Sequence, residues 1–535
     1  MDVSWVKPNA RSLAWFHLYF TKIILLVFFF FKLISFVAII KAQQLLLFIL
    51  NYLYMQNHNA LFVNSEIGTL KRLLVHSPDS GLGKVVPSKA QDWLFEDIVH
   101  LNTIRKEEYD YYTKILLLFL DPEKVKNKIP AIDAEENNRN FYKPEHPDFF
   151  RSDKVIELEW LLAEILMNDS IKHSLVASVC AIEGCTFNTQ NTLMQYDAAS
   201  LAKTFISGAA KNKEMLFAPI PNFIFTRDIG ITIKDHVLLN KPAKKARTRE
   251  ALLAKYIFFN HPFFKDYRNN IIELTDSYQN LLLPKEEDER KITLEGGDIM
   301  VISNNHLLVG VSERTSAEAA ARITHTVFEK NLMEKVTIIK IPKKRDYMHI
   351  DTVFTQVKRN VWVMLGNFSK KAVLHEDEDM IERTLELKKE EKIKIKQFKK
   401  SDPNNSTHFD SLEELLIDIS KTDFHCKEED IKIIFSGNNE FPYSAREQWT
   451  DSCNLLALKE GVVLGYDRND KTAEAFKTAG FNVIHAKELI PKLVAGEIKV
   501  SDINDTLILM PSAELSRARG GFHCMSMPLL REQIN

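Results

Sequence analysis

The chain has 535 residues, of which 45% are hydrophobic, 27% charged and 10% aromatic, with only 17 Gly and 18 Pro; this excludes collagen-like and low-complexity chains and predicts a globular protein with several folding units or one domain built from repeats. The 70 basic and 72 acidic residues leave a formal charge of −2, so no overall field would steer the protein onto nucleic acid. Nucleic acid is therefore not expected as a partner.

The cysteine content argues against structural disulfides and zinc ribbons. The five cysteines are odd in number and include no CxxC pair, whereas both kinds of site use paired cysteines. They are Cys180, Cys185, Cys426, Cys453 and Cys524. We therefore expect reduced thiols and a cytoplasmic protein.

Residues 1–54 form a hydrophobic leader that differs from the rest of the chain. The run from Ile23 to Ile40 has 18 residues with Lys32 inside it, and a second apolar run, Leu45 to Leu50, follows. This is marginal for a membrane span of about 20 residues, and Lys32 would cost about 2.5 to 3.5 kcal/mol at mid-membrane. A signal peptide is disfavoured because no clear cleavage site follows. Two readings stay open: an anchor, the only route to membrane association, or non-native translation upstream of Met55.

From Leu61 onward the pattern predicts an α/β protein. The segment from Thr69 to His76 is expected to be a buried strand that ends in a turn, and helical spacing of apolar residues predicts a mostly helical insert over about residues 89–207. Beyond the insert, short apolar strands alternate with amphipathic helices. The expected strands are Phe223 to Phe225, Val237 to Leu239, Ile299 to Ile302, Leu307 to Val311, Val336 to Ile341, Val361 to Leu365, Ile431 to Phe435, Val462 to Tyr466 and Asn482 to His485.

A densely charged segment interrupts this alternation. From Glu376 to Lys400 acidic residues are followed by basic ones, which predicts a solvated helix or a surface excursion. The next residues, Ser401 to Ser406, are expected to form a loop because Pro, Asn and Ser favour turns. No chemical role is assigned to either.

Four short clusters combine charged residues with apolar strand sequence, which a protein interior tolerates only when the charges have partners. In the first, Pro221 to Asp228, an apolar strand is expected to end in Arg227 and Asp228. A strand end can place a carboxylate in a cleft. Considered alone, Arg227 and Asp228 fit an ordinary ion pair better.

The second cluster, Leu294 to Met300, places two glycines between Glu295 and Asp298. Glycine allows a close approach of the main chain to a ligand, although a Gly-Gly turn between strands is the commoner explanation. In the third, His349 and Asp351 would face the same side of a strand and so share one site. A histidine hydrogen-bonded in the core is the alternative.

The fourth cluster, Ser516 to Pro528, places Cys524 after a Gly-Gly turn and close in sequence to Arg517, Arg519 and His523. Neighbouring positive charge can lower a thiol pKa from about 8.5 to between about 3.5 and 7.5, and the thiolate is the nucleophile. We therefore expect Cys524 to be reactive. The other four cysteines lack such neighbours and are expected to be inert.

In this order the clusters resemble the arginine deiminase family of the guanidino-modifying pentein superfamily. The shared motifs are Asn-x-x-Phe-Thr-Arg-Asp, Glu-Gly-Gly-Asp, Ser-Glu-Arg-Thr, Met-His-x-Asp-Thr-Val-Phe and Arg-Gly-Gly-x-x-Cys-Met-Ser-Met-Pro. The likeness runs from about Asn64 to Glu532 and includes Phe441 to Trp449 and Gly461 to Asn469. It implies an α/β fold in the form of a five-bladed pseudo-symmetric pentein propeller with a helical insert after the first blade, so that residues 55–535 would be the catalytic domain.

The resemblance implies hydrolysis of free L-arginine to L-citrulline and ammonia with no metal or organic cofactor. Cys524 would attack the guanidino carbon to give a covalent thiouronium, and His349 would be the general acid and base. Asp228 and Asp351 would hold the guanidinium nitrogens, while Glu295 would orient His349. The residues implied to bind the substrate carboxylate are Asn222, Arg247, Arg314 and Arg519. Spacing favours Arg247 over Arg249, and Asp298 is expected to be structural.

Two alternatives stay open within the same fold: an amidinotransferase, and a catalytically inactive arginine-binding protein. A membrane-tethered scaffold would require residues 1–54 to be retained. The chain also departs from the family where it has Ile229 and Gly230 after Asp228, and His523 where arginine is frequent. A homo-oligomer is expected.

Overall fold

The computed structural model describes residues 61–78, 81–90, 92–95, 97–134, 146, 149–275, 292–370 and 393–534. The expectations for residues 1–54, and for the charged segment up to residue 392, therefore lie outside the described residues. In the ranges that are described, no helix is both long and apolar enough to cross a membrane.

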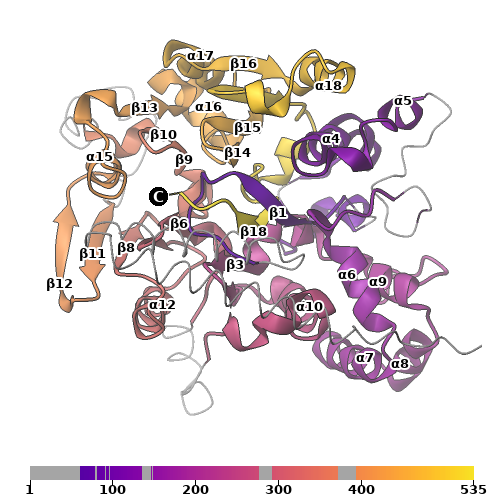
Figure 1. The fold of residues 1–535 in the computed structure, drawn as a ribbon. Helices are drawn as coiled ribbons and strands as arrows, with labels where there is room; N and C mark the ends of the chain where they lie inside the picture. The colour runs from indigo at the N-terminus through magenta and orange to yellow at the C-terminus, as the bar shows by residue number, and fades with distance from the viewer. Residues whose placement is uncertain are drawn as a thin grey trace, which may run out of the picture. The chain divides into compact units, whose positions relative to one another are not determined.

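The fold is α/β, and the described strands form five separate sheets that share one pairing pattern (Figure 1). In each sheet a first strand pairs antiparallel with a second, and the second pairs parallel with a third. In that order the strands are β3 (Gly230–Ile233), β4 (His236–Leu239) and β5 (Ile271–Ile272); β6 (Ile299–Ser303), β7 (His306–Val311) and β8 (Lys335–Lys340); β9 (Phe354–Lys358), β10 (Val361–Met364) and β13 (Lys432–Phe435); β14 (Leu456–Lys459), β15 (Val462–Tyr466) and β17 (Thr506–Met510); and β18 (Met527–Arg531), β1 (Leu70–Val75) and β2 (Val155–Glu157).

The last of these sheets joins the two ends of the described chain. The strand β1 pairs antiparallel with β18, for example Leu74 with Met527, although more than 450 residues separate them. Two other sheets carry added strands: β11 (Lys394–Lys399) and β12 (Asp402–Phe409) extend the sheet beyond β8, and β16 (Asn482–His485) lies beside β17.

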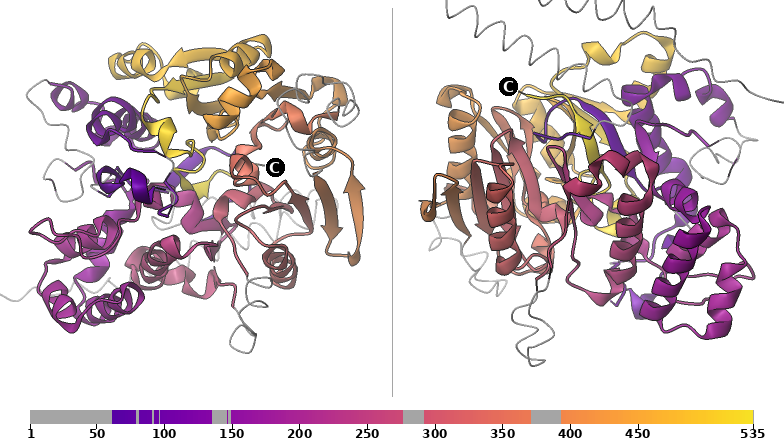
Figure 2. Two further views of the ribbon diagram at one scale, coloured as in Figure 1. Left: turned by 180° about the vertical axis from the view of Figure 1, so that it is seen from behind. Right: turned by 60° about the horizontal axis from the view of Figure 1, so that its bottom comes forward.

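Helices connect and cover the sheets. They include α4 (Tyr109–Leu120), α6 (Leu158–Leu166), α7 (Asp169–Glu183), α8 (Phe187–Met194), α9 (Ala198–Ser207), α10 (Thr248–Asn260), α12 (Ala317–Glu329), α15 (Leu412–Thr422), α16 (Tyr443–Trp449), α17 (Asp470–Thr478) and α18 (Ala486–Ala495). The stretch expected as a helical insert contains α4 and α6 to α9, but β2 divides it. Helix α4 packs near α18, whereas α6 to α9 lie together beside α10 (Figures 1 and 2).

The strand predictions are confirmed with one exception. The strand expected before residue 77 and all but one of those after residue 207 are present within one residue of their expected ends. The exception is Phe223 to Phe225, which lies in two consecutive 3₁₀ turns, Pro221–Ile224 and Thr226–Ile229. Pro221 has no amide hydrogen to donate to a sheet, and the Phe225 amide bonds the Asn222 carbonyl at 2.9 Å. These hydrogen bonds are local, so no strand forms.

Around residue 400 the helix alternative and the loop prediction are wrong. Lys394–Lys399 is not a helix but strand β11, and Asp402–Phe409, expected to begin as a loop, is strand β12. The strand β11 pairs along its whole length with β8, and its Ile395 is buried. The polar side chains of β12 are tolerated because β12 is an exposed edge strand, with α15 beside it.

Candidate active site

The site is built from short segments that precede the first strand of different sheets. Asp228 lies just before β3, Glu295 before β6, His349 before β9 and Cys524 before β18. Because the five sheets repeat one pairing pattern, these segments occupy equivalent places in their sheets. Their side chains are buried, with exposed fractions between 1% and 5%.

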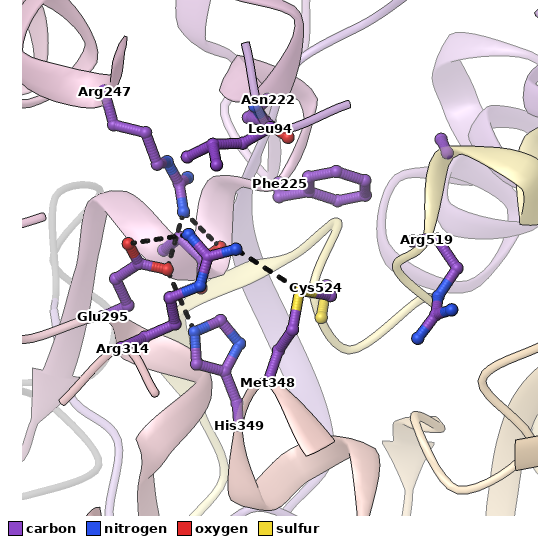
Figure 3. Close-up of a pocket in the computed structure, with 12 residues that line it drawn as sticks. Leu94, Asn222, Phe225, Arg247, Glu295, Arg314, Met348, His349, Arg519 and Cys524 are labelled. Atoms are coloured by element: carbon purple, nitrogen blue, oxygen red, sulfur yellow. Dashed lines mark hydrogen bonds and ion pairs between the residues drawn. The ribbon is translucent and has the colours of Figure 1, made fainter. Parts of the chain in front are cut away.

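These segments border one pocket (Figure 3). The residues that line it are Leu94, Asn222, Phe225, Asp228, Arg247, Glu295, Arg314, Met348, His349, Ala518, Arg519 and Cys524. Eight of the nine site residues expected from the sequence are in this lining, and the ninth, Asp351, contacts the Cys524 thiol. The thiol and the imidazole of His349 thus share one hollow.

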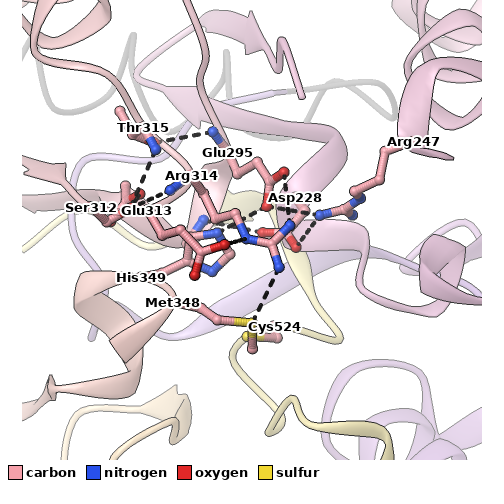
Figure 4. Close-up of polar contacts among 12 residues, drawn as sticks. Asp228, Arg247, Glu295, Ser312, Glu313, Arg314, Thr315, Met348, His349 and Cys524 are labelled. Atoms are coloured by element: carbon pink, nitrogen blue, oxygen red, sulfur yellow. Dashed lines mark hydrogen bonds and ion pairs between the residues drawn. The ribbon is translucent and has the colours of Figure 1, made fainter. Parts of the chain in front are cut away.

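A network of charges occupies one wall of the pocket. His349 Nε2 lies 3.0 Å from Glu295 Oε2, and Arg247 Nη1 donates both to Asp228 Oδ2 at 2.8 Å and to Glu295 Oε2 at 3.0 Å. Arg247 Nε also bonds Glu250 at 2.8 Å. A protein guanidinium therefore already lies between two carboxylates of the pocket (Figures 3 and 4).

This network keeps Glu295 ionised and His349 protonated. Burial alone would lower the pKa of His349, but the carboxylates of Asp228 and Glu295 raise it to about 10. Burial alone would raise the pKa of Glu295, but Arg247 and the bonded His349 hold it well below its usual range. At neutral pH the imidazole is therefore a cation able to donate a proton.

The prediction that neighbouring positive charge lowers the pKa of Cys524 is wrong. Burial, and then the negative charges of Asp351 and Asp228, raise the pKa of the Cys524 thiol well above its ordinary value, where local arginines were expected to lower it. Arg517 fails to act because it is exposed and paired with Asp97 at 2.7 Å. The free protein therefore holds Cys524 as a thiol despite the protonated His349, and a further cation in the pocket would be needed to favour the thiolate.

We expect alkylation of Cys524 by iodoacetamide in the ligand-free protein to be half-maximal above pH 9, because the raised pKa delays thiolate formation. In Asp351→Asn one negative neighbour is lost, and the profile should move to lower pH. Peptide-resolved mass spectrometry would separate Cys524 from the other thiols. An unchanged profile in the variant would contradict the assigned cause.

The second prediction that needs correction concerns how His349 and Asp351 come together. They do not share the face of a strand: His349 is extended, but Asp351 lies in a 3₁₀ turn, Ile350–Thr352. The Thr352 amide donates back to the His349 carbonyl at 3.2 Å, which closes the turn. His349 points into the pocket, whereas Asp351 accepts a hydrogen bond from Cys524 Sγ at 3.5 Å.

The residues expected to bind a substrate carboxylate differ in their present contacts. Arg314 Nη1 lies 3.9 Å from Glu295 Oε1, and Nη2 lies 3.7 Å from the Met348 sulfur (Figure 4). The Arg519 guanidinium lies over the Trp449 ring, 3.6 Å from its centroid, and its Nε and Nη1 have no hydrogen-bond partner among the described residues. Within the described ranges, the ring of Trp449 is thus the contact that holds the Arg519 guanidinium.

The two remaining assignments can be compared with their neighbours. The Asn222 amide donates to the Trp93 carbonyl at 2.8 Å and borders the pocket. Arg249, the rejected alternative to Arg247, is turned away: its Nε bonds the Phe205 carbonyl at 2.8 Å, and it lies over Phe217. Only Arg247 of this pair lines the pocket.

Two glycines permit the close packing behind His349. A Cβ on Gly297 would lie 2.6 Å from His349 Nδ1, and one on Gly296 would lie 2.0 Å from the Arg227 carbonyl. Asp298, expected to be structural, accepts from Ser312 Oγ at 2.6 Å and from the Ile350 amide at 3.0 Å. This ties the glycine turn to the segment that carries His349.

We expect Gly297→Ala to lower kcat on the order of 100-fold, because the new methyl group must displace the imidazole, and small misplacements cost about this much. Gly184→Ala is the control. It introduces strain at φ 65° but meets no atom within 4 Å, so it should lower stability by about 1 kcal/mol and leave kcat unchanged. Equal effects on kcat from both variants would contradict the role of Gly297.

Sequence reasoning missed two buried residues beside the nucleophile. Asn454 Oδ1 accepts from the Cys524 amide at 3.0 Å, and its Nδ2 donates to the Asp351 carbonyl at 3.2 Å. Glu66 lies 3.2 Å from His523. Neither stands in a cluster with other reactive residues, and the only signal was their inclusion in the stretch that resembles the family.

A thiol, a protonated imidazole and several carboxylates in one buried pocket define a cysteine-dependent enzyme that acts on a cationic substrate. Residues 183–531 match the family model described as arginine deiminase. The arginine deiminase of Borrelia recurrentis is 30% identical over 505 residues, which cover 90% of this chain and 100% of that one. The arginine deiminase of Staphylococcus aureus is 30% identical over 498 residues, with 88% and 98% covered. The chain belongs to the arginine deiminase family.

The solved structures that the chain matches are more distant in sequence. The amidinotransferase SxtG of Microseira wollei has a TM-score of 0.40 and 12% identity, with 89% of this chain and 98% of that chain covered. The dimethylarginine dimethylaminohydrolase of Pseudomonas aeruginosa has a TM-score of 0.31 and 15% identity, with 57% and 76% covered.

Proposed function

We propose that this enzyme hydrolyses free L-arginine to L-citrulline and ammonia through a covalent adduct on Cys524. The observation that carries the proposal is the shared pocket of the Cys524 thiol and the His349 imidazole, lined by carboxylates, in a chain of the arginine deiminase family. A guanidinium is a weak electrophile because its charge is delocalised. The site must therefore fix it, attack it with a strong nucleophile and protonate the leaving nitrogen.

The carboxylates would bind the guanidinium of the substrate. Asp228 and Asp351 would accept its N–H groups in charge-assisted hydrogen bonds. The position of Arg247 supports such binding, because its own guanidinium already lies between Asp228 and Glu295. The substrate carboxylate would be bound by Asn222, Arg247, Arg314 and Arg519. Arg247 would then leave the carboxylates and turn toward the other end of the substrate.

The positive charge of the substrate would also lower the raised pKa of the Cys524 thiol. Asp351 and Asp228 oppose ionisation of Cys524 in the free protein, and a bound guanidinium would offset those charges and favour the thiolate. Nucleophile activation would thus be coupled to substrate binding. A free thiolate would not stand exposed to other electrophiles between turnovers.

The first half-reaction forms the adduct. Binding of the cationic substrate releases the Cys524 thiol proton to solvent, because His349 is already protonated. The thiolate then adds to the guanidino carbon, and one electron pair moves onto nitrogen to give a neutral tetrahedral species. His349, held protonated by Asp228 and Glu295, donates its proton to one terminal nitrogen. The C–N bond breaks, ammonia departs, and a thiouronium cation remains on the sulfur with His349 neutral.

The second half-reaction restores the thiolate and the protonated His349, and the thiolate takes up a proton from solvent when the product leaves. Neutral His349 takes a proton from water, and the hydroxide adds to the thiouronium carbon. The C–S bond breaks with the electron pair on sulfur, and loss of one proton from oxygen gives citrulline. The proton taken from water stays on His349 and the one lost from oxygen binds ammonia, so arginine and water become citrulline and ammonium.

The architecture of the site leads to a proposal about the whole fold. We propose that the five sheets, with their repeated antiparallel and parallel pairings, are the blades of a five-bladed pseudo-symmetric propeller, and that residues 55–535 are the catalytic domain. The equivalent positions of Asp228, Glu295, His349 and Cys524 before first strands support this arrangement. The five cysteines are free, which fits a cytoplasmic enzyme. A homo-oligomer stays a prediction.

The test is to incubate the purified full chain with L-arginine, agmatine or Nω-methylated arginines and to measure citrulline and ammonia together. We expect equal amounts of both products from L-arginine. Agmatine lacks the carboxylate that the arginines would bind, so its kcat/KM should be at least about 100-fold lower, equivalent to about 2.7 kcal/mol. An amidino product formed on an added amine, without citrulline, would instead identify an amidinotransferase, and no product from any substrate would overturn the proposal.

A further inference from the structure

A buried path of contacts joins Glu66, just before β1, to the nucleophile. His523 Nε2 lies 3.2 Å from Glu66 Oε2, and His523 Nδ1 lies 2.9 Å from Asp351 Oδ2. The same oxygen of Asp351 accepts a hydrogen bond from Cys524 Sγ at 3.5 Å. None of the four side chains belongs to a residue more than 5% exposed. The path therefore runs through the interior for its whole length.

The geometry requires a particular protonation state of His523. An ionised carboxylate can only accept hydrogen bonds, and a neutral imidazole has only one N–H. Because both ring nitrogens face carboxylate oxygens, both contacts are hydrogen bonds only when the ring carries two N–H groups and a positive charge. Such a cation also offsets the cost of placing Glu66 and Asp351 together in the interior.

Glu66 is fixed and charged. Its Oε1 accepts from the Val301 amide at 3.2 Å, and Arg227 Nη2 lies 3.4 Å from its Oε2. Burial alone would raise the pKa of Glu66, but Arg227 and His523 hold it well below its usual range, with help from Arg531. Glu66 therefore presents a constant negative charge to His523.

Asp351 is oriented by this arrangement. Its Oδ2 is occupied by His523 and Cys524, while its Oδ1 is buried and has no hydrogen-bond partner in the part of the chain that the structure describes. Its backbone carbonyl is held by Asn454 Nδ2 at 3.2 Å. The unoccupied oxygen is thus available to a guanidinium N–H, and the occupied oxygen fixes the plane of the carboxylate.

We propose that Glu66 and His523 are positioning residues: Glu66 keeps His523 doubly protonated, and His523 holds Asp351 so that Oδ1 receives the guanidinium of the substrate. Neither residue touches the substrate. The inference rests on the proposed hydrolysis of arginine, because it assigns Asp351 its partner in that reaction. It deepens the assignment by naming the two residues that orient this carboxylate. One of them, Glu66, is more than 280 residues from Asp351 in the sequence.

Glu66→Gln tests the proposal because it removes the charge and keeps the shape. We expect kcat for citrulline formation to fall on the order of 100-fold, as for other small misplacements in active sites. Asp423→Asn is the matched control: Asp423 lies 2.6 Å from His306 Nδ1 and also pairs with Lys335, so it too is a carboxylate between a histidine and a cation, but it is half-buried and outside the pocket. It should lower the melting temperature and leave kcat within twofold.

The pH profile separates positioning from simple stabilisation. The charged and titratable groups that face this path are Arg227, Arg531, His349, Asp228 and Asp451, and none is altered in Glu66→Gln. With Glu66 neutral, His523 loses the charged partner at Nε2, one of the two carboxylates that favour its doubly protonated form. We expect kcat/KM of Glu66→Gln to fall with an inflection as pH rises, because His523 is easier to deprotonate without the Glu66 charge; this inflection should be absent from the native enzyme and from Asp423→Asn. The profile of Glu66→Asp, which keeps the charge, should lack this inflection.

The outcomes are distinct. A kcat loss and a new inflection in Glu66→Gln, with neither in Asp423→Asn, support the proposal. Native-like kcat in Glu66→Gln, or the same profile in both variants, overturns it. If Glu66→Gln does not fold, His523→Gln takes its place, and unchanged kcat there overturns the proposal equally. Failure of the native enzyme to form citrulline would refute the proposed function instead.

Discussion

Replacement of Cys524 by alanine should abolish citrulline formation, with kcat reduced by at least about four orders of magnitude, since removal of a nucleophile from such a set costs about this much or more. The thiol is the group that would bond to the guanidino carbon, and the lining of the pocket contains no other thiol. L-Arginine should still bind, because the carboxylates remain. Isothermal titration calorimetry of Cys524→Ala would measure that binding.

The control for this variant is Cys453→Ala. Cys453 is fully buried but does not line the pocket, so its loss should lower stability and spare kcat. Acid quenching of the native enzyme during turnover, followed by mass spectrometry of the peptide that contains Cys524, should reveal the thiouronium adduct. Undiminished turnover by Cys524→Ala would rule out the covalent mechanism.

Replacement of His349 by glutamine should reduce kcat by about 10² to 10⁴, the usual contribution of a general acid or base. The pKa of His349, raised to about 10, makes the imidazolium the form present at neutral pH, and glutamine has no proton to give to the departing nitrogen. Quenched-flow mixing should detect little adduct on Cys524, because the first half-reaction is slowed.

A matched variant for His349 is His306→Gln. His306 is buried and bonded to Asp423 and Thr337, outside the pocket. It should affect stability and leave kcat unchanged. A kcat for His349→Gln within tenfold of native would contradict the general acid assignment and transfer that role to another group.

The sequence predicted the strands well because their apolar runs are local signals. Val462 to Tyr466, for example, is a continuous apolar run at a buried position. Prediction from the sequence failed where hydrogen bonding decides the local structure. Pro221 directs the following residues into 3₁₀ turns, and pairing with β8 makes a strand of Lys394–Lys399 despite its charge.

The candidate site was predicted through motifs, and its electrostatics were not. Proximity in sequence suggested that Arg517 would act on Cys524, but Arg517 finds Asp97, 420 residues away, whereas Asp351 and Asp228 reach the thiol. Glu66 was missed for the same reason, because it meets His523 across 457 residues. Such long-range partners depend on how the sheets assemble, and a single sequence does not contain that information in readable form.

The pairing of β1 with β18 has a consequence for the ribosome-bound chain. The strand β18 follows the nucleophile by only two intervening residues, so the thiol reaches its place only when the final strand has docked on the first. Closure of this sheet spans almost the whole described polypeptide, and contacts of such separation form late and slowly. Chains that end before β18 therefore lack an assembled site.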